Sequence, residues 1–112
     1  FGQAGDRKDE EIAGLVRAVC ELGPSRLLVC DLPGYERGRE SGAVSKLIAE
    51  FAAEEGVPKT AGSMFTTPVD GVAQALREAR DGDCLLLLAL TQRDEVLAMI
   101  RSFVADGVEG LE

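Results

Sequence analysis

Short apolar runs alternate along this sequence with segments whose apolar residues recur at helical spacing. In chain order, the pattern predicts a helix over 9–22, a strand over 27–31, a helix from Val44 that ends before Gly56, a strand over about 59–65, a helix over 68–79, a strand over 84–90 and a fourth helix after Thr91. Strands that alternate with helices imply right-handed crossovers and a parallel sheet. We therefore predict an α/β fold: a Rossmann-like, doubly wound, mostly parallel sheet with helices on both faces.

The run 84–90 is the strongest strand in this prediction. All seven of its residues are apolar, which is typical of a strand that helices cover on both faces. Cys84 in this run and Cys30 in the earlier one are predicted to be small buried side chains. Phe1 is predicted to close a further strand that begins upstream and lies close to 27–31 and 84–90.

Two threonines are placed to begin helices. Thr67 precedes Pro68, and this pair predicts an N-cap followed by a proline at the first helical position. Thr91, with Asp94 three residues later, predicts a capping box at the start of the fourth helix. That helix is predicted to bury an apolar stripe made of Val96, Leu97, Ile100 and Val104.

Length and charge argue against several classes of protein. The 112 residues fit one domain, taken as 1–110, and the terminal pair 111–112 resembles a cloning remnant. A net charge of −8 argues against a nucleic-acid binder, because such a protein needs a basic face. The longest apolar run has seven residues, whereas a membrane-spanning helix needs about 20, so no membrane partner is predicted.

The sequence has no histidine, and its three cysteines show no C-x-x-C spacing. Without histidine, Ser-His catalysis and most transition-metal sites are excluded. The cysteine pattern does not indicate a disulfide framework, so a reducing cytoplasm is the predicted location.

Polar segments follow the predicted strands, at the sheet edge where ligands bind in open parallel sheets. These segments contain five of the 12 basic residues, namely Arg7, Lys8, Arg37, Arg39 and Arg93. We therefore expect a locally positive edge suited to a phosphate or a carboxylate, although loops are also polar for reasons unrelated to function.

The nucleotide-binding motifs of α/β proteins are absent. The sequence contains no G-x-x-x-x-G-K-[ST] loop, and no G-x-G-x-x-G follows a predicted strand. The turn between Gly2 and Gly5 leads into Asp6 and Arg7, which could present backbone N–H groups and one charge pair to a phosphate or Mg²⁺. Asp6 is equally compatible with a simple helix cap.

Three segments, in order along the chain, resemble the C-terminal domain of the Mur ligase family and are most similar to its cyanophycin synthetase branch. The first is Gly5-Asp-Arg-Lys-Asp-Glu-Glu-Ile12, at a predicted strand–helix junction. The second is Asp31 followed by Glu36-Arg-Gly-Arg-Glu-Ser-Gly-Ala-Val44. The third is Ala75-Leu-Arg-Glu-Ala-Arg-Asp-Gly-Asp83 before an apolar run, with Asp81 where the family usually has proline.

This resemblance implies an ATP-dependent amide ligase, in which the amine of an amino acid attacks a carboxylate activated as an acyl phosphate. The P-loop and most contacts to ATP and Mg²⁺ would belong to a central ATPase domain of the same chain, over which the C-terminal domain closes. Asp6 and Arg7 would face ATP or its Mg²⁺, and Arg37, Arg39 and Asp31 would lie near the amino-acid site. The resemblance assigns no catalytic residue and no metal ligand to this segment, and the isolated domain is not expected to be active.

A non-catalytic α/β binding or interaction module is the alternative, either flavodoxin-like or a degenerate ligase domain. A receiver domain is less compatible, because the clustered acidic residues and the late lysine that it needs are missing. A G-K-[ST] loop roughly a domain length before Phe1 would favour the ligase.

Overall fold

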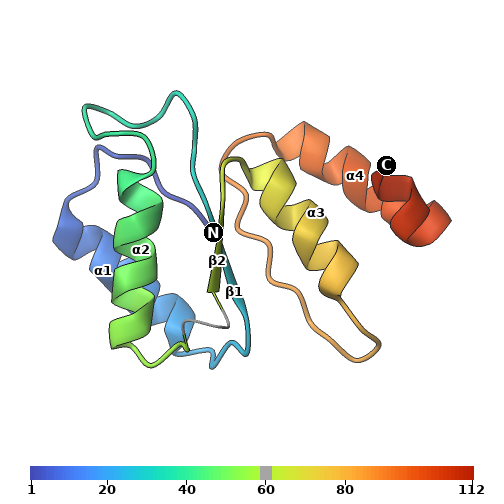
Figure 1. The fold of residues 1–112 in the computed structure, drawn as a ribbon, viewed down its shortest axis with the longest axis horizontal. Coiled ribbons are helices and arrows are strands. Elements are labelled where there is room, and N and C mark those ends of the chain that lie inside the picture. Colours follow the sequence, from blue (N-terminus) through green and yellow to red (C-terminus); the bar gives the residue numbers. More distant parts are fainter. Residues whose placement is uncertain (59–61) are drawn as a thin grey trace.

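The computed structural model describes residues 1–58 and 62–112, and two short parallel strands lie at its centre (Figure 1). The strands are β1 (Leu27–Cys30) and β2 (Gly62–Phe65), paired from Leu27 opposite Gly62 to Cys30 opposite Phe65. The described part of the predicted strand 59–65 is therefore confirmed, while residues 59–61 lie outside the described residues.

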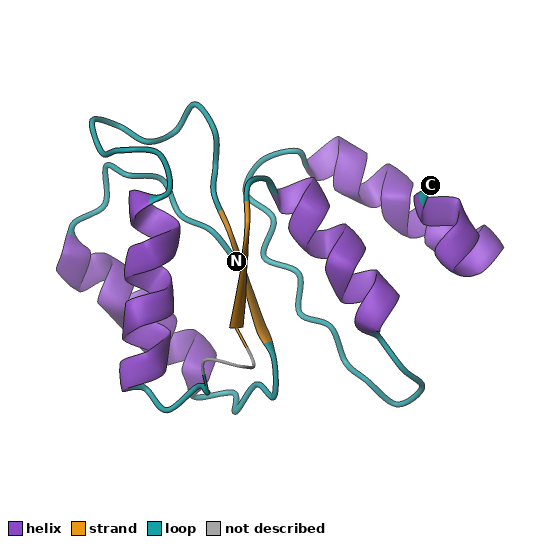
Figure 2. Ribbon diagram, viewed as in Figure 1, coloured by secondary structure: helices purple, strands orange, loops and turns teal. Residues whose placement is uncertain are grey.

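Helices cover both faces of this small sheet, as Figures 1 and 2 show. On one face lie α1 (Asp9–Cys20) and α2 (Ala43–Glu54), and on the other lie α3 (Pro68–Glu78) and α4 (Arg93–Asp106). A 3-10 helix, Gly107–Leu111, follows α4. The predicted α/β class and the helices on both faces are confirmed, but the described residues do not form a wider, doubly wound sheet.

The main core lies between the sheet and the α1–α2 pair. It is formed by Ile12, Val16, Leu27, Val29, Val44, Ile48 and Ala52. The two strand residues of this core alternate along β1, as expected when one face of a strand meets a helix layer. Both helices begin at the carboxyl end of the sheet, after the N-cap residues Lys8 and Gly42 (Figure 1).

On the other face, α3 begins where the sequence predicts. The Asp70 N–H donates to Thr67 Oγ1 (3.2 Å), and Pro68 occupies the first turn. Gly71 lies against Phe65 and Cys30, where an added Cβ would be 3.7 Å from the Phe65 ring. A Cβ at this distance would make ordinary van der Waals contact, so α3 packs on the strands at a normal separation.

Phe1 pairs with the edge of β1 that β2 leaves open. Its amino group donates to the Leu28 carbonyl oxygen (3.1 Å), and the Cys30 N–H donates to the Phe1 carbonyl oxygen (2.9 Å). These two bonds are those of a parallel pair in which Phe1 lies opposite Val29. The predicted parallel pairing of Phe1 beside β1 is confirmed at this one position.

The prediction of a strand over 84–90 is wrong. Residues 84–89 are irregular, and the side chain of Leu86 is 61% exposed. Cys84, predicted to be buried, is exposed, whereas Cys30 is buried as predicted. No strand lies beside 84–89 in the described part of the chain to accept its backbone hydrogen bonds, so its apolar composition is not enough to make it a strand.

The start of α4 also differs from the prediction. The N-cap is Gln92, with φ 55°, and not Thr91. The Gln92 side chain oxygen accepts from the Val69 N–H (3.1 Å), so the residue is held by a contact to α3 that the sequence alone does not reveal.

Only part of the predicted stripe on α4 is buried. Val96 is buried and Ile100 is half-buried, but Leu97 is 50% exposed and Val104 is 79% exposed. Among the described residues, the helix packs on α3 through Val96, with Met99, Ile100 and Phe103 partly buried against the same cluster. None of the described helices is long and apolar enough to cross a membrane.

Candidate functional site

Two loops meet at the carboxyl end of β1, one from Gly2 to Lys8 and one from Asp31 to Gly42. The Gly5 N–H donates to the Tyr35 carbonyl oxygen (2.8 Å). An added Cβ at Gly5 would collide with the Glu36 carbonyl oxygen, so only glycine permits this close approach of the two backbones. The loops therefore form one unit at the edge where α/β sheets bind ligands.

Arg39 fastens the two loops together. Its Nε donates to the Gly5 carbonyl oxygen (2.9 Å), and its Nη2 donates to the Arg7 carbonyl oxygen (2.8 Å) and to Asp9 Oδ1 (2.7 Å). The planar guanidinium is well suited to three acceptors in a fixed arrangement. We call this set of contacts the Arg39 clamp.

Next to the clamp, Asp31 directly follows β1 and contacts the first turn of α2. The Ser45 hydroxyl donates to Asp31 Oδ1, and Ser45 is only 2% exposed. Burial raises the pKa of the Asp31 carboxyl, and the negative charge of Glu36 raises it further. Asp31 is thus held in one orientation by a buried hydroxyl in an environment that disfavours its negative charge.

A small hollow of about 10 Å³, room for about one water-sized group, opens beside Asp31. We call it the acceptor recess, and it is lined by Gln3, Asp31, Leu32, Tyr35, Glu36, Glu40, Gly42 and Val44. The Gln3 side-chain oxygen is buried and meets no hydrogen-bond donor among the described residues. Carboxylates and this oxygen give the recess hydrogen-bond acceptors, so its chemistry suits a donor such as a protonated amine.

Asp6 and Arg7 project from the first loop, exposed, just before α1. Arg7 lies 3.9 Å from Glu11, a weak contact between two half-exposed side chains. Because the Arg39 clamp holds the Arg7 carbonyl, the backbone that carries these two charges is fixed.

Arg37 lies on the second loop, with its guanidinium carbon 5.1 Å from the centre of the Tyr35 ring. Its backbone adopts a left-handed conformation, with φ 52°, which is uncommon for a residue with a side chain. Arg7, Arg37 and Arg39 therefore share one edge of the sheet, as predicted, whereas Arg93 begins α4 on the α3 side.

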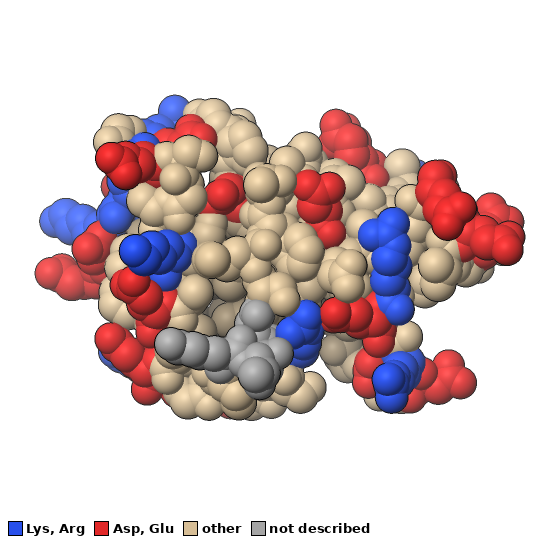
Figure 3. All heavy atoms as spheres, in the orientation of Figure 1, with Lys and Arg blue, Asp and Glu red and all other residues tan. Residues whose placement is uncertain are grey.

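The predicted positive character of this edge is wrong. Asp9 pairs with Arg39, Glu11 lies near Arg7, and Glu36 and Glu40 line the recess between them. Figure 3 shows basic and acidic atoms interleaved on the visible face of the molecule. The edge is of mixed charge because acidic residues near in sequence and in space accompany its arginines.

Sequence reasoning missed Gln3, Glu36, Glu40 and Ser45. A signal for Ser45 exists, because it lies three residues before Ile48 and seven before Ala52, on the buried face of its helix. A polar residue at such a position needs a buried partner, and the nearest charged residue at a strand end is Asp31. Gln3 carries no such signal, since the packing of the two loops alone buries it.

The described residues contain no group of three or more carboxylates and cysteines that could hold a metal ion. Asp6 is a single exposed carboxylate, so the described residues do not by themselves fit the Mg²⁺ that the resemblance implies. No family model, no curated protein and no solved structure matches the chain. The described residues define an α/β domain with a clamped pair of loops and an acceptor recess at its sheet edge.

Proposed function

We propose that the chain is the C-terminal domain of an ATP-dependent amide ligase, the class that the resemblance to the Mur ligase family and its cyanophycin synthetase branch implies. The observation that carries the proposal is the acceptor recess, at the sheet edge where this class receives the incoming amino acid. We further propose the doubly wound sheet and the cytoplasmic location that the same resemblance implies.

The recess is proposed to bind the protonated amine of the amino acid. An ammonium group has three N–H donors and no acceptor, and the recess offers Asp31, Glu36 and the unpartnered oxygen of Gln3. Ser45 holds Asp31 in place, and Arg39 holds the loop that carries Gln3. Arg37, whose guanidinium lies over the ring of Tyr35 in the recess lining, is proposed to pair with the carboxylate of the same amino acid.

Asp6 and Arg7 are proposed to face the ATP bound by a central ATPase domain. The bond from Arg39 to the Arg7 carbonyl fixes the backbone from which the Arg7 guanidinium would reach a phosphoryl group and stabilise its charge. Closure of this domain over the other would exclude water from the acyl phosphate. ATP and Mg²⁺ would be held mainly by that central domain, so the chain alone is expected to show no ATP turnover.

The test is ligation by the longer protein that carries this domain, assayed with ATP and a panel of amino acids. Arg7→Ala or Asp6→Ala should lower the rate of amide formation by roughly 100-fold, the size of one lost transition-state contact. Arg17→Ala is the matched control, because Arg17 is also exposed and paired with a glutamate, Glu55, but lies in the last turn of α1, at the opposite end of the helix from Arg7. Its rate should stay unchanged.

A non-catalytic binding module is the second candidate, and the lack of a metal-holding group among the described residues is expected of both candidates. It predicts that no amino acid is ligated, or that the Arg7 and Arg17 variants behave alike. Either result would contradict the ligase proposal.

A further inference from the structure

The acceptor recess is sized for one small polar group. Its volume of about 10 Å³ is close to the least that holds a single water molecule. An unsubstituted ammonium group is about as large as a water molecule, whereas a methyl group on the same nitrogen adds a further heavy atom. The volume of the recess therefore distinguishes a primary amine from an N-methylated one.

Hydrogen bonds hold the walls of the recess at this size. Three turns in a row close the second loop through backbone bonds, from the Tyr35 N–H to the Leu32 oxygen (2.9 Å), from the Arg39 N–H to the Glu36 oxygen (3.1 Å) and from the Ala43 N–H to the Glu40 oxygen (3.1 Å). The Arg39 clamp then ties this loop to the one that carries Gln3. Because a bonded and packed backbone resists expansion, the recess does not widen easily for a larger group.

Gln3 gives the recess a buried acceptor that a ligand can satisfy. Its Oε1 atom is buried, and no donor among the described residues reaches it. A ligand that donates to this oxygen satisfies it, whereas a ligand that covers it without donating leaves a buried polar atom unpaired, which weakens binding. Asp31 lines the same recess and is held in place by the Ser45 hydroxyl.

The tetrahedral nitrogen of a bound amino acid uses one of its four bonds for its own Cα, which points out of the recess. Its other three bonds face the lining, where Asp31, Glu36 and the Gln3 oxygen offer acceptors. A primary ammonium fills all three directions with N–H donors. A secondary ammonium places a carbon in one of them, which leaves an acceptor unpaired and needs room that the recess lacks.

We propose that the acceptor recess selects primary amines and that Gln3 is the residue that sets this specificity. The substrate class is then amino acids with an unsubstituted amine, while N-methyl amino acids and proline are rejected. This inference rests on the proposed function, because it specifies which amines the recess takes. A site that hydrogen-bonds a substrate N–H rejects the analogue that lacks it more strongly than an apolar pocket rejects a misfit.

The test titrates the chain with glycine and, separately, with N-methylglycine, and follows the NMR shifts of Asp31 and Ser45. Both compounds carry one positive charge on nitrogen at neutral pH, so they differ in size and in the number of N–H donors but not in charge. N-methylglycine should bind about tenfold more weakly than glycine, or weaker still. Gln3→Ala removes one acceptor and enlarges the recess, so the ratio of the two dissociation constants should fall towards one.

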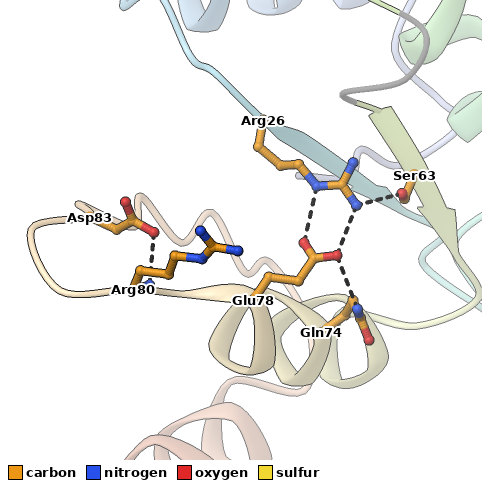
Figure 4. Close-up of polar contacts among 6 residues, drawn as sticks. All are labelled: Arg26, Ser63, Gln74, Glu78, Arg80 and Asp83. Carbon is orange, nitrogen blue, oxygen red and sulfur yellow. Dashed lines mark hydrogen bonds and ion pairs between the residues drawn. The ribbon is translucent and has the colours of Figure 1, made fainter.

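Gln74→Ala is the matched control. Gln74 is also a half-buried glutamine, but it lies on α3, on the other face of the sheet. There it donates to Glu78 (3.1 Å), which also accepts from Arg26 (3.0 and 3.1 Å), as Figure 4 shows. Its replacement should leave the preference for glycine as it is in the native chain.

Equal binding of the two compounds to the native chain would overturn the specificity and leave an amine site in place. A Gln3→Ala variant that still discriminates in full would overturn the role of Gln3. No shift with either compound would contradict the amine site itself, and with it the observation that carries the proposed function. If discrimination holds but the longer protein ligates no amino acid, the ligase proposal is wrong and the specificity for primary amines stands.

Discussion

Asp31 is the residue on which the chemistry of the acceptor recess depends. Its charge is disfavoured by burial and by Glu36, while the Ser45 hydroxyl keeps one of its oxygens oriented. The identity of Asp31 as a candidate was predictable, since it ends a strand. The raised pKa of Asp31 was not predictable, because it depends first on burial of the carboxyl and then on Glu36, which a loop brings close to it.

Replacing Asp31 by Asn should change how stability depends on pH. Because the folded-state pKa of Asp31 lies above its unfolded-state value, the stability that it contributes is fully present below the unfolded-state pKa, about 3.9 for an ordinary aspartate. That stability is lost as the pH rises through the folded-state pKa. Asp31→Asn keeps an acceptor for Ser45 and removes the titration, so the variant should gain stability relative to the native chain as the pH rises.

Urea unfolding at several pH values between 4 and 8 measures this difference. Asp94→Asn, at an exposed aspartate in the first turn of α4, is the control and should show no such trend. A native chain and an Asp31→Asn variant whose stabilities run parallel over this range would contradict the account of the recess.

Arg39 acts on the site through the backbone that it holds. Arg39→Ala removes three hydrogen bonds to Gly5, Arg7 and Asp9, and should lower the free energy of unfolding by about 2 kcal/mol. Arg39→Lys keeps the charge but not the planar arrangement of donors, so it should recover little of this loss. Chemical denaturation measures both, and a lysine variant as stable as the native chain would show that charge alone matters.

At the scale of elements, periodicity and capping predicted most of the helices and the strand β1. Thr67 and Pro68 define the start of α3, and the spacing of Ile12 and Val16 defines the buried face of α1, because these signals act within a few residues. The prediction of a strand over 84–90 was wrong because a strand also needs a neighbouring strand to pair with. The presence of that neighbour depends on the whole sheet and not on these seven residues.

The apolar stripe on α4 also shows that an apolar period predicts a helix but not which of its residues meet a neighbouring element. Val96 is 4% exposed beside α3, whereas Val104 is 79% exposed near the end of the helix, although both fit the same apolar period. Val96→Ala should therefore lower the free energy of unfolding by about 2 kcal/mol, and Val104→Ala by less than about 0.5 kcal/mol. Thermal or urea unfolding measures the pair, and equal losses would show that α4 is buried on more sides than the fold allows.

At the scale of the whole molecule, two features share one small sheet. The carboxyl end of β1 carries the clamped loops and the acceptor recess, and an apolar groove lies between β1 and the segment 84–89. The net charge of −8 also favours the approach of a cationic group over an anionic one. The location of the clamped loops at this edge was predicted from the sequence. The predicted positive charge of the edge was wrong, because the prediction considered the arginines and not the carboxylates with which they pair.

The central claim is that the acceptor recess binds the amine of an amino acid, and an NMR titration of the chain with free amino acids tests it most directly. We predict that Gln3, Asp31 and Ser45 shift together, with a dissociation constant on the order of 1 mM. Asp31→Asn, or acetylation of the amine, should abolish the shifts, whereas Asp94→Asn should leave them unchanged. Equal shifts with acetylated amino acids, or none at these three residues with any free amino acid, would contradict the claim.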